Sequence, residues 1–136
     1  MTAATRSTLK TLIAHPDTAI HALRQGLPIK RFDELLERLE ITQAQLTGIL
    51  RIPPSTLARR RNEERLSPEE SDRLYRLAHL HSLATQVLGD EARASIWLKT
   101  AKRALGDASP LELADTEPGV KSVETLLHQI EHGLFV

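Results

Sequence analysis

The chain has 136 residues, 18 basic against 18 acidic side chains, and an apolar content of 40%. These values fit one or two small folded domains and exclude disordered and collagen-like classes. Cysteine is absent, which excludes disulfides, thiolate nucleophiles and cysteine-based metal sites. No apolar run reaches the roughly 20 residues of a membrane span, and the N-terminus lacks the apolar stretch of a secretory signal. We therefore expect a cytoplasmic protein without membrane contact.

The zero net charge conceals a difference between the two halves. Residues 1–66 hold 11 basic and 7 acidic side chains, whereas residues 67–136 hold 7 and 11. The first half thus carries a net charge of +4 and the second half −4. This asymmetry predicts that the first half meets phosphate groups and that the second half does not.

Helix signals follow one another along the whole chain, and no segment alternates apolar and polar residues as a strand does. The pattern predicts an all-α fold, a small helical bundle. Serine, threonine and aspartate caps mark most of the helix starts, and glycines mark several of the ends. The expected helices lie at 9–13, 18–25, 29–39 with Pro28 at its start, 43–50, 55–62, 68–88, 91–105, a single turn after 109, and 117–132.

The helix at 68–88 is apolar around more than half of its circumference, which is typical of a helix buried on several sides. A capping box at Ser67–Glu70 opens it. Because its apolar surface exceeds what one small domain needs to cover, we expect part of it, or the N-terminal segment, at a self-interface. A homodimer follows as an expectation.

One pattern is compatible with metal chemistry. His128, Glu131 and His132 form the H-x-x-E-H spacing of inverted zinc peptidases, with Glu124 as the only nearby third ligand. A catalytic zinc needs a third protein ligand and a walled cleft. We interpret these residues as the exposed polar side of an amphipathic helix, and we expect neither a metal, nor a cofactor, nor enzymatic activity.

Residues 42–62 predict a helix-turn-helix, in which the second helix enters the major groove of DNA. Two short helices flank a tight turn, and Leu46, Leu50, Ile52 and Leu57 are spaced to form the core between them. Arginine suits bidentate contact with guanine or phosphate, and serine and threonine can donate to phosphate. The candidate DNA-contacting residues are Gln43, Ser55, Thr56, Arg59, Arg60, Arg61, Asn62 and Arg65.

Two positions depart from the usual helix-turn-helix pattern. The turn position normally held by glycine is Arg51, where a left-handed backbone costs a non-glycine residue about 1 kcal/mol. Pro54 opens the second helix and cannot donate a hydrogen bond. Because of both departures, the DNA sequence that this motif prefers stays open.

Several short stretches of the chain together form a recognisable pattern: residues 26–28, 57–60, 65–74, 97–98, 104–106, 109–113, 116, 119 and 130–133. Over about residues 26–135 this pattern resembles antitoxins of the Xre/MbcA/ParS family. After the Trp97-Leu98 pair the family usually has Pro-Asn, where this chain has Ala101-Lys102. We expect that change to make the helix more continuous, and we expect Trp97 and Leu98 in the core.

The resemblance implies a type II antitoxin built from an N-terminal helical extension (1–28), an Xre-like helix-turn-helix domain (29–88) and a helical C-terminal toxin-binding domain (89–136). Such antitoxins sit beside a toxin, commonly of the RES type, which degrades NAD⁺. They block the toxin by direct binding and repress the shared promoter. The implied partners are a cognate toxin, operator DNA and a second copy of the chain.

We expect the toxin contacts on the last helix and the tail, which combine charge with apolar surface. A toxin cleft that binds the phosphates of NAD⁺ should be basic and should attract carboxylates. Two other interpretations stay open at this stage: a stand-alone helix-turn-helix regulator, and a helical adaptor without a role on DNA. The candidate toxin-contacting residues are Glu124, Glu131, His132, Leu134, Phe135 and Val136.

Overall fold

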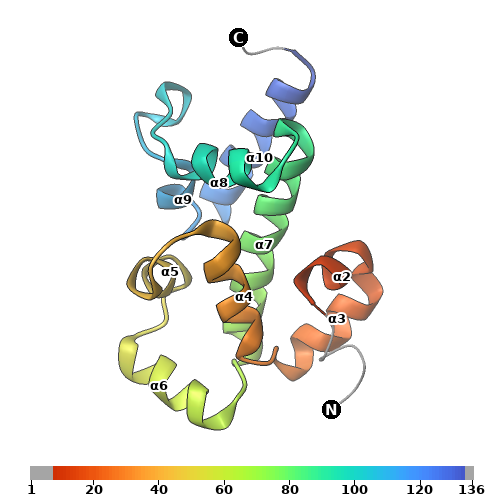
Figure 1. Ribbon diagram of the computed structural model, residues 1–136, viewed down its shortest axis with the longest axis vertical. Coiled ribbons are helices and arrows are strands. Elements are labelled where there is room, and N and C mark those ends of the chain that lie inside the picture. Colours follow the sequence, from red (N-terminus) through yellow and green to blue (C-terminus); the bar gives the residue numbers. More distant parts are fainter. Residues whose placement is uncertain (1–7, 134–136) are drawn as a thin grey trace. The chain divides into compact units, whose positions relative to one another are not determined.

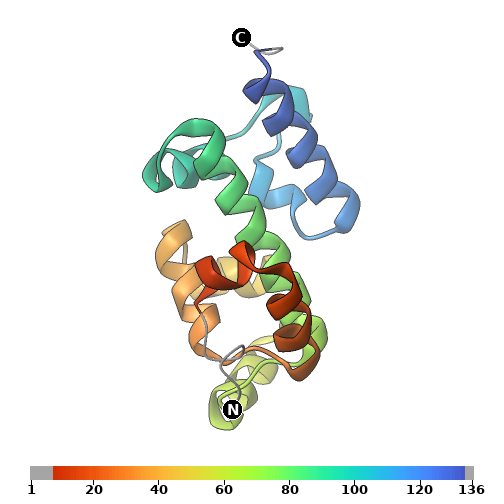
Figure 2. The same cartoon turned by 90° about the vertical axis from the view of Figure 1, so that its right-hand side faces the viewer.

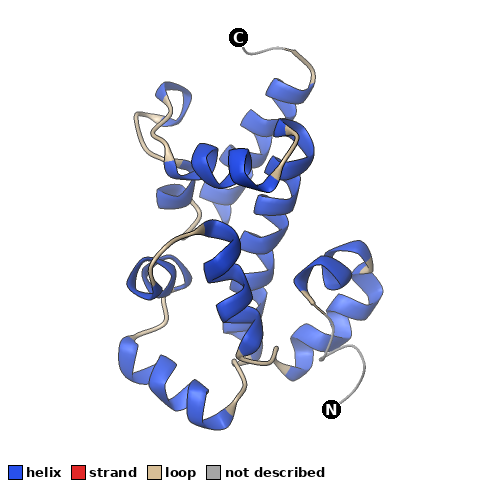
Figure 3. Cartoon of the chain, viewed as in Figure 1, coloured by secondary structure: helices blue, strands red, loops and turns tan. Residues whose placement is uncertain are grey.

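A computed structural model describes residues 8–133, which form α-helices joined by short loops (Figure 1). The all-α prediction is confirmed, because this part of the chain contains helices and loops but no strand (Figure 3). Within the same residues, no helix combines the length and the apolar character that crossing a membrane requires. The chain divides into two compact units, Met1–Ala78 and His79–Val136, which are described separately.

The first unit is built on amphipathic helices whose apolar positions recur at the helical period. The predicted bounds are confirmed to within two residues for every helix before α7. The helices are α2 (Leu9–Ala14), α3 (Pro16–Gln25), α4 (Lys30–Leu39), α5 (Gln43–Leu50), α6 (Pro54–Glu63) and the first half of α7 (Pro68–Leu88). Its largest fully buried side chains are Leu9, Leu12, Leu27, Phe32, Leu35, Leu39, Leu46, Leu50, Leu57, Leu66, Leu74 and Leu77.

A short backbone pairing connects the start of α4 to the loop after α6. The Leu66 N–H donates to the Leu27 carbonyl over 2.9 Å, and Pro28 pairs with Arg65 in an isolated bridge. Pro28 therefore precedes the helix that it was expected to open, and α4 begins at Lys30. Gly26 has φ +88, and a Cβ there would collide with the Leu66 carbonyl, so this crossing requires glycine.

The second unit contains the end of α7, α8 (Glu91–Lys99), a 3₁₀ turn η1 (Arg103–Leu105), α9 (Pro110–Leu113) and α10 (Glu117–Glu131). The predicted caps are confirmed, since the side chains of Asp90, Ser109 and Thr116 each accept a hydrogen bond from a backbone N–H of the first turn. Short α9 contacts both α8 and α10, and Figure 2 gives a second view of these elements. The buried apolar side chains are Leu80, Ala84, Ala94, Leu98, Leu111, Val120, Val123, Leu126 and Leu127.

The predicted continuous helix over 91–105 is wrong. Helix α8 ends at Lys99, and Thr100 has an extended backbone at φ −101, ψ 132. A local turn outcompetes the helix, because Lys102 donates its backbone N–H to Ala108 and accepts from Asp107. The Lys102 ammonium also lies 4.9 Å from the centre of the Trp97 ring, a cation–π contact.

One further expectation about burial needs correction. Leu98 is fully buried as expected, but Trp97 is only half-buried and lies at the surface beneath Lys102. On α7, Leu74, Leu77 and Leu80 are at most 1% exposed within the chain itself. Later in the same helix, Leu83, Val87 and Leu88 are only half-buried. The homodimer remains a prediction.

Candidate nucleic-acid interface

Helices α5 and α6 form the predicted helix-turn-helix. The Thr42 hydroxyl and the Gln45 side chain form a reciprocal capping box at the start of α5, which satisfies backbone donors that the first turn leaves unpaired. Helix α5 ends at Leu50, and Arg51 after it has the left-handed conformation φ 56, ψ 47, as its place in the turn predicted. Ile52 and Leu57 are each 2% exposed and close the corner.

One face of α6 is exposed to solvent. Ser55, Ala58, Arg59 and Asn62 are all exposed, and their spacing of three, four and seven residues places them on one side of the helix. The Arg59 side chain is 63% exposed, and its Nε lies 3.8 Å from Glu63. These residues form what we call the α6 outer face.

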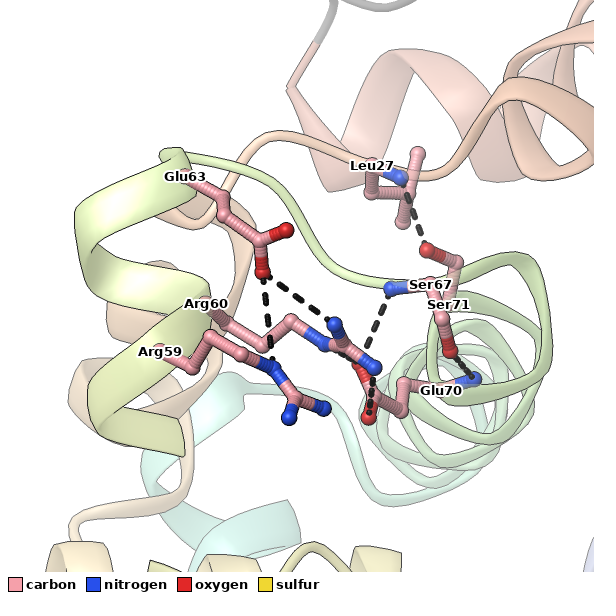
Figure 4. Close-up of polar contacts among 7 residues, drawn as sticks. All are labelled: Leu27, Arg59, Arg60, Glu63, Ser67, Glu70 and Ser71. Carbon is pink, nitrogen blue, oxygen red and sulfur yellow. Dashed lines mark hydrogen bonds and ion pairs between the residues drawn. The ribbon is translucent and has the colours of Figure 1, made fainter. Parts of the chain in front are cut away.

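Arg60 extends from α6 to Glu70 in the first turn of α7 and is bound within the unit (Figure 4). Its Nε donates to Glu70 Oε1 over 2.7 Å and its Nη2 donates to Oε2 over 3.1 Å. The side chain is 17% exposed, against 7% for Glu70. The hydrogen bond to Glu70 raises the pKa of Arg60. Burial by itself would raise the pKa of Glu70, but the hydrogen bonds from Arg60 and Ser67 outweigh it and lower the pKa.

Arg61 connects α6 to two other helices. Its Nη1 and Nη2 donate to the two carboxylate oxygens of Asp33 over 3.2 and 3.0 Å. Its Nη2 also donates to Gln43 Oε1 over 2.9 Å. The guanidinium lies 5.7 Å from the centre of the buried Phe32 ring. Arg61 therefore ties the second helix of the motif to α4 and to the start of α5.

Arg65 is likewise used for structure. Its Nη1 donates to the carbonyls of Gly26 and Gln25 over 2.6 and 3.3 Å, which supports the pairing between the two loops. Of the other predicted residues, Gln43 is exposed and Thr56 is half-buried. The arginine cluster read from the sequence thus separates into an exposed Arg59 and three arginines that bind other parts of the unit. Sequence reasoning missed Ala58 and the Glu70 carboxylate.

Two of the residues predicted to contact a toxin lie on α10, and His132 follows its last residue. Glu124 is half-buried, whereas Glu131 and His132 are exposed, and Glu131 lies 3.8 Å from the imidazole of His128. Leu134, Phe135 and Val136 lie outside the described residues. No group of three or more histidine, aspartate or glutamate side chains that could hold a metal ion occurs between residues 8 and 133.

A second surface of the same unit was not anticipated. A hollow of about 470 Å³ lies between η1, α9 and α10. Helix α10 lines it with Ser122, Thr125 and Gln129, which lie on a different side of the helix from Glu124 and Glu131 at 100° per residue. The polar residues of α10 could be recognised in the sequence. The opposing wall from η1 could not, because the sequence predicted one continuous helix over residues 91–105.

Comparisons with known proteins agree with this two-part organisation. Residues 18–79 match the antitoxin Xre-like helix-turn-helix domain, and residues 83–133 match the antitoxin Xre/MbcA/ParS C-terminal toxin-binding domain. The chain is 31% identical to an antitoxin Xre of Yersinia enterocolitica over 118 residues, which cover 85% of this chain and 80% of that protein. It is 32% identical to an antitoxin Xre of Pseudomonas putida over 134 residues, covering 94% and 83%.

A third relative is the Prs ADP-ribosylating antitoxin of a Sphingobium strain, 26% identical over 132 residues that cover 90% of this chain and 83% of that protein. Both domain matches fall on the elements described above: the first contains α5 and α6, and the second contains α8 to α10. The chain therefore belongs to the Xre/MbcA/ParS family of antitoxins and is the antitoxin of a toxin–antitoxin system, with a helix-turn-helix domain followed by a helical toxin-binding domain.

Proposed function

We propose that this antitoxin represses its own operon by placing α6 in the major groove of operator DNA, and that it neutralises a RES-type toxin that degrades NAD⁺. The α6 outer face carries the DNA part of the proposal. Arginine can bind guanine and asparagine can bind adenine in a bidentate manner, which gives Arg59 and Asn62 base-reading roles. Ala58 on the same face has a small side chain and lets the helix approach the bases closely.

The other predicted residues take supporting roles in this proposal. Ser55 and Thr56 lie in the first turn of α6 and are suited to phosphate contact, as is Gln43 at the start of α5. Arg60, Arg61 and Arg65 hold α6 in place through the bonds described above. One such motif reads only a few base pairs, so a homodimer on two half-sites about one helical turn apart completes the proposal.

A gel-shift titration with the promoter region upstream of the gene tests DNA binding. Arg59→Ala should weaken binding by about 1–3 kcal/mol if the lost contact is to a base. Arg93→Ala is the matched control, because Arg93 is 75% exposed and lies in the other unit. Binding should also weaken with added salt through counterion release. Equal affinities of the Arg59 and Arg93 variants across the salt series would contradict the assignment.

For toxin binding, we propose the acidic side of α10 and the tail, namely Glu124, Glu131, His132 and residues 134–136. A cleft that holds the phosphates of NAD⁺ is basic, and the carboxylates here would be drawn to it. Deleting residues 134–136 should release toxin activity in a co-expression growth assay while circular dichroism and DNA binding stay unchanged. Full neutralisation by the truncated chain would move the interface elsewhere, with the η1–α9–α10 hollow as the next surface to test.

The name of the Sphingobium relative supports a second candidate partner, an ADP-ribosylating toxin. The two candidates differ in what the freed toxin does. A RES-type toxin should lower cellular NAD⁺ without labelling proteins, whereas an ADP-ribosylating toxin should attach ADP-ribose to a target. Measuring both after depletion of the antitoxin decides between them. A neighbouring gene that encodes no toxin would favour the stand-alone regulator.

A further inference from the structure

Glu63, the last residue of α6, places one carboxylate oxygen between two arginines (Figure 4). Its Oε1 accepts a hydrogen bond from Arg60 Nη1 over 3.2 Å and lies 3.8 Å from Arg59 Nε. The Arg59 side chain is 63% exposed and the Glu63 side chain is 52% exposed, so a ligand in solvent can reach both. The arginine to which we assign base reading therefore has a negative charge beside it.

The position of this carboxylate is fixed from inside the unit. An exposed ion pair by itself contributes little, but Arg60 is held by two hydrogen bonds to Glu70, whose side chain is only 7% exposed. The network thus begins at a buried carboxylate, passes through Arg60 and Glu63, and ends at Arg59. Because its inner part is bonded within the unit, the Glu63 charge is held next to Arg59 before DNA binds.

The contact with Glu63 leaves the outer end of the Arg59 guanidinium free to bind. Glu63 Oε1 lies beside Nε, and Figure 4 shows the two Nη atoms of Arg59 pointing away from it. An arginine can donate two parallel hydrogen bonds to the acceptors on the edge of guanine. A guanine edge carries no net charge, whereas a phosphate on the same Nη atoms brings a negative charge close to the Glu63 carboxylate.

We propose that Glu63 is a specificity-determining residue, which holds Arg59 for a guanine edge and opposes its contact with phosphate. The inference rests on the DNA binding proposed above and adds to it a residue that lowers affinity for unrelated DNA. Specificity can come from a repulsive charge as well as from attractive contacts. Since binding to random sequence depends mainly on phosphate contacts, the Glu63 charge weakens that binding more than it weakens binding to the operator.

Glu63→Gln removes the charge at nearly unchanged shape. The amide oxygen still accepts from Arg60, and Glu70 still holds Arg60, so the melting temperature should stay near that of wild type. Gel-shift titrations compare the promoter region with a random duplex of the same length. Affinity for the random duplex should rise about fivefold, the factor for one like-charge contact removed at about 4 Å in water. Affinity for the promoter should rise less, so the ratio of the two affinities falls.

The matched control is Glu64→Gln, which removes the same charge from the next residue, also exposed, and keeps the carboxylate beside Arg59. An effect of net charge alone would raise both affinities by the same factor in both variants. The ratio of promoter to random affinity should therefore fall in Glu63→Gln and stay at the wild-type value in Glu64→Gln.

A double variant tests whether Glu63 acts through Arg59. In the Arg59→Ala background, Glu63→Gln should raise the affinity for the random duplex no more than Glu64→Gln does, because the partner is absent. A wild-type ratio in Glu63→Gln, an equal fall in Glu64→Gln, or a full fivefold rise without Arg59 overturns the role of Glu63. A wild-type protein that binds neither duplex, or both equally, instead overturns the DNA reading on which the inference rests.

Discussion

Helices α6 and α10 carry the two candidate interfaces of this antitoxin, and they are held in place by different forces. Helix α6 buries one side chain, Leu57, and relies on polar bonds from Arg60 and Arg61 to its neighbours. Helix α10 buries four apolar side chains, and its acidic residues lie on another side. On α6, polar side chains both hold the helix against its neighbours and form its exposed surface. On α10, apolar side chains hold the helix and a separate set of polar side chains forms the surface.

This difference determines how substitutions in each helix should be interpreted. Removing Arg60 or Arg61 from α6 changes the fold and the surface together, so a loss of DNA binding in those variants does not by itself identify a contact. Removing a glutamate from the exposed side of α10 changes the surface only. The free energy of unfolding of variants in the two helices tests this contrast.

Arg60→Ala should lower the free energy of unfolding by about 3 kcal/mol, because it leaves the Glu70 carboxylate buried without its charge partner. Urea unfolding measures the effect. The matched control is Arg59→Ala on the same helix, where an exposed side chain should change stability by less than about 0.5 kcal/mol. Equal stabilities of the two variants would remove the distinction between the inner and outer sides of α6.

Acidic pH should weaken the first unit through Glu70. Its pKa is lowered in the folded protein, so its contribution to stability is complete above the ordinary glutamate pKa of about 4.3 and is lost as the pH falls through the lower folded value. Urea unfolding at several pH values should show this loss, and Glu70→Gln should show a shallower dependence between the two pKa values. Parallel curves would mean that the carboxylate contributes nothing through its charge.

Arg51→Gly should raise the free energy of unfolding by about 0.5 kcal/mol. Relief of the left-handed strain is worth about 1 kcal/mol, and the greater freedom of glycine in the unfolded chain offsets part of it. The converse control is Gly106→Ala, at φ +71 with open space around the new Cβ, which should destabilise by a similar strain energy. Thermal melts measure this change in stability. Gel shifts show whether the loss of the Arg51 charge also weakens DNA binding.

Glu131→Gln on α10 should leave the free energy of unfolding within about 0.5 kcal/mol of wild type, as expected of an exposed side chain. Its effect should appear as faster dissociation from the toxin in a surface-binding assay, since charge complementarity is lost. Ser122→Ala, on the side of α10 that lines the η1–α9–α10 hollow, is the paired variant. If only Ser122→Ala speeds dissociation from the toxin, the toxin docks on the η1–α9–α10 hollow rather than on the acidic side of α10.

The sequence by itself determined the local structure of this protein. Helix α5 matches its predicted bounds, the caps at Thr42, Asp90 and Thr116 form as expected, and Arg51 adopts the left-handed turn conformation. These features depend on interactions within a few residues, which a single sequence displays. The helix-turn-helix and its buried leucines follow from the same periodicity.

Only the tertiary structure decided which arginines remain exposed. Arg60 pairs with Glu70, ten residues away, and Arg61 pairs with Asp33, 28 residues away, and neither spacing is a local signal. The helix break after Lys99 is a similar case, since Lys102 exchanges its helical bonds for those to Ala108 and Asp107. Side-chain type and helical period fix which residues can serve an interface. Charge pairing between segments that meet only on folding determines which side chains stay accessible, since the buried Glu70 carboxylate holds the Arg60 guanidinium within the unit.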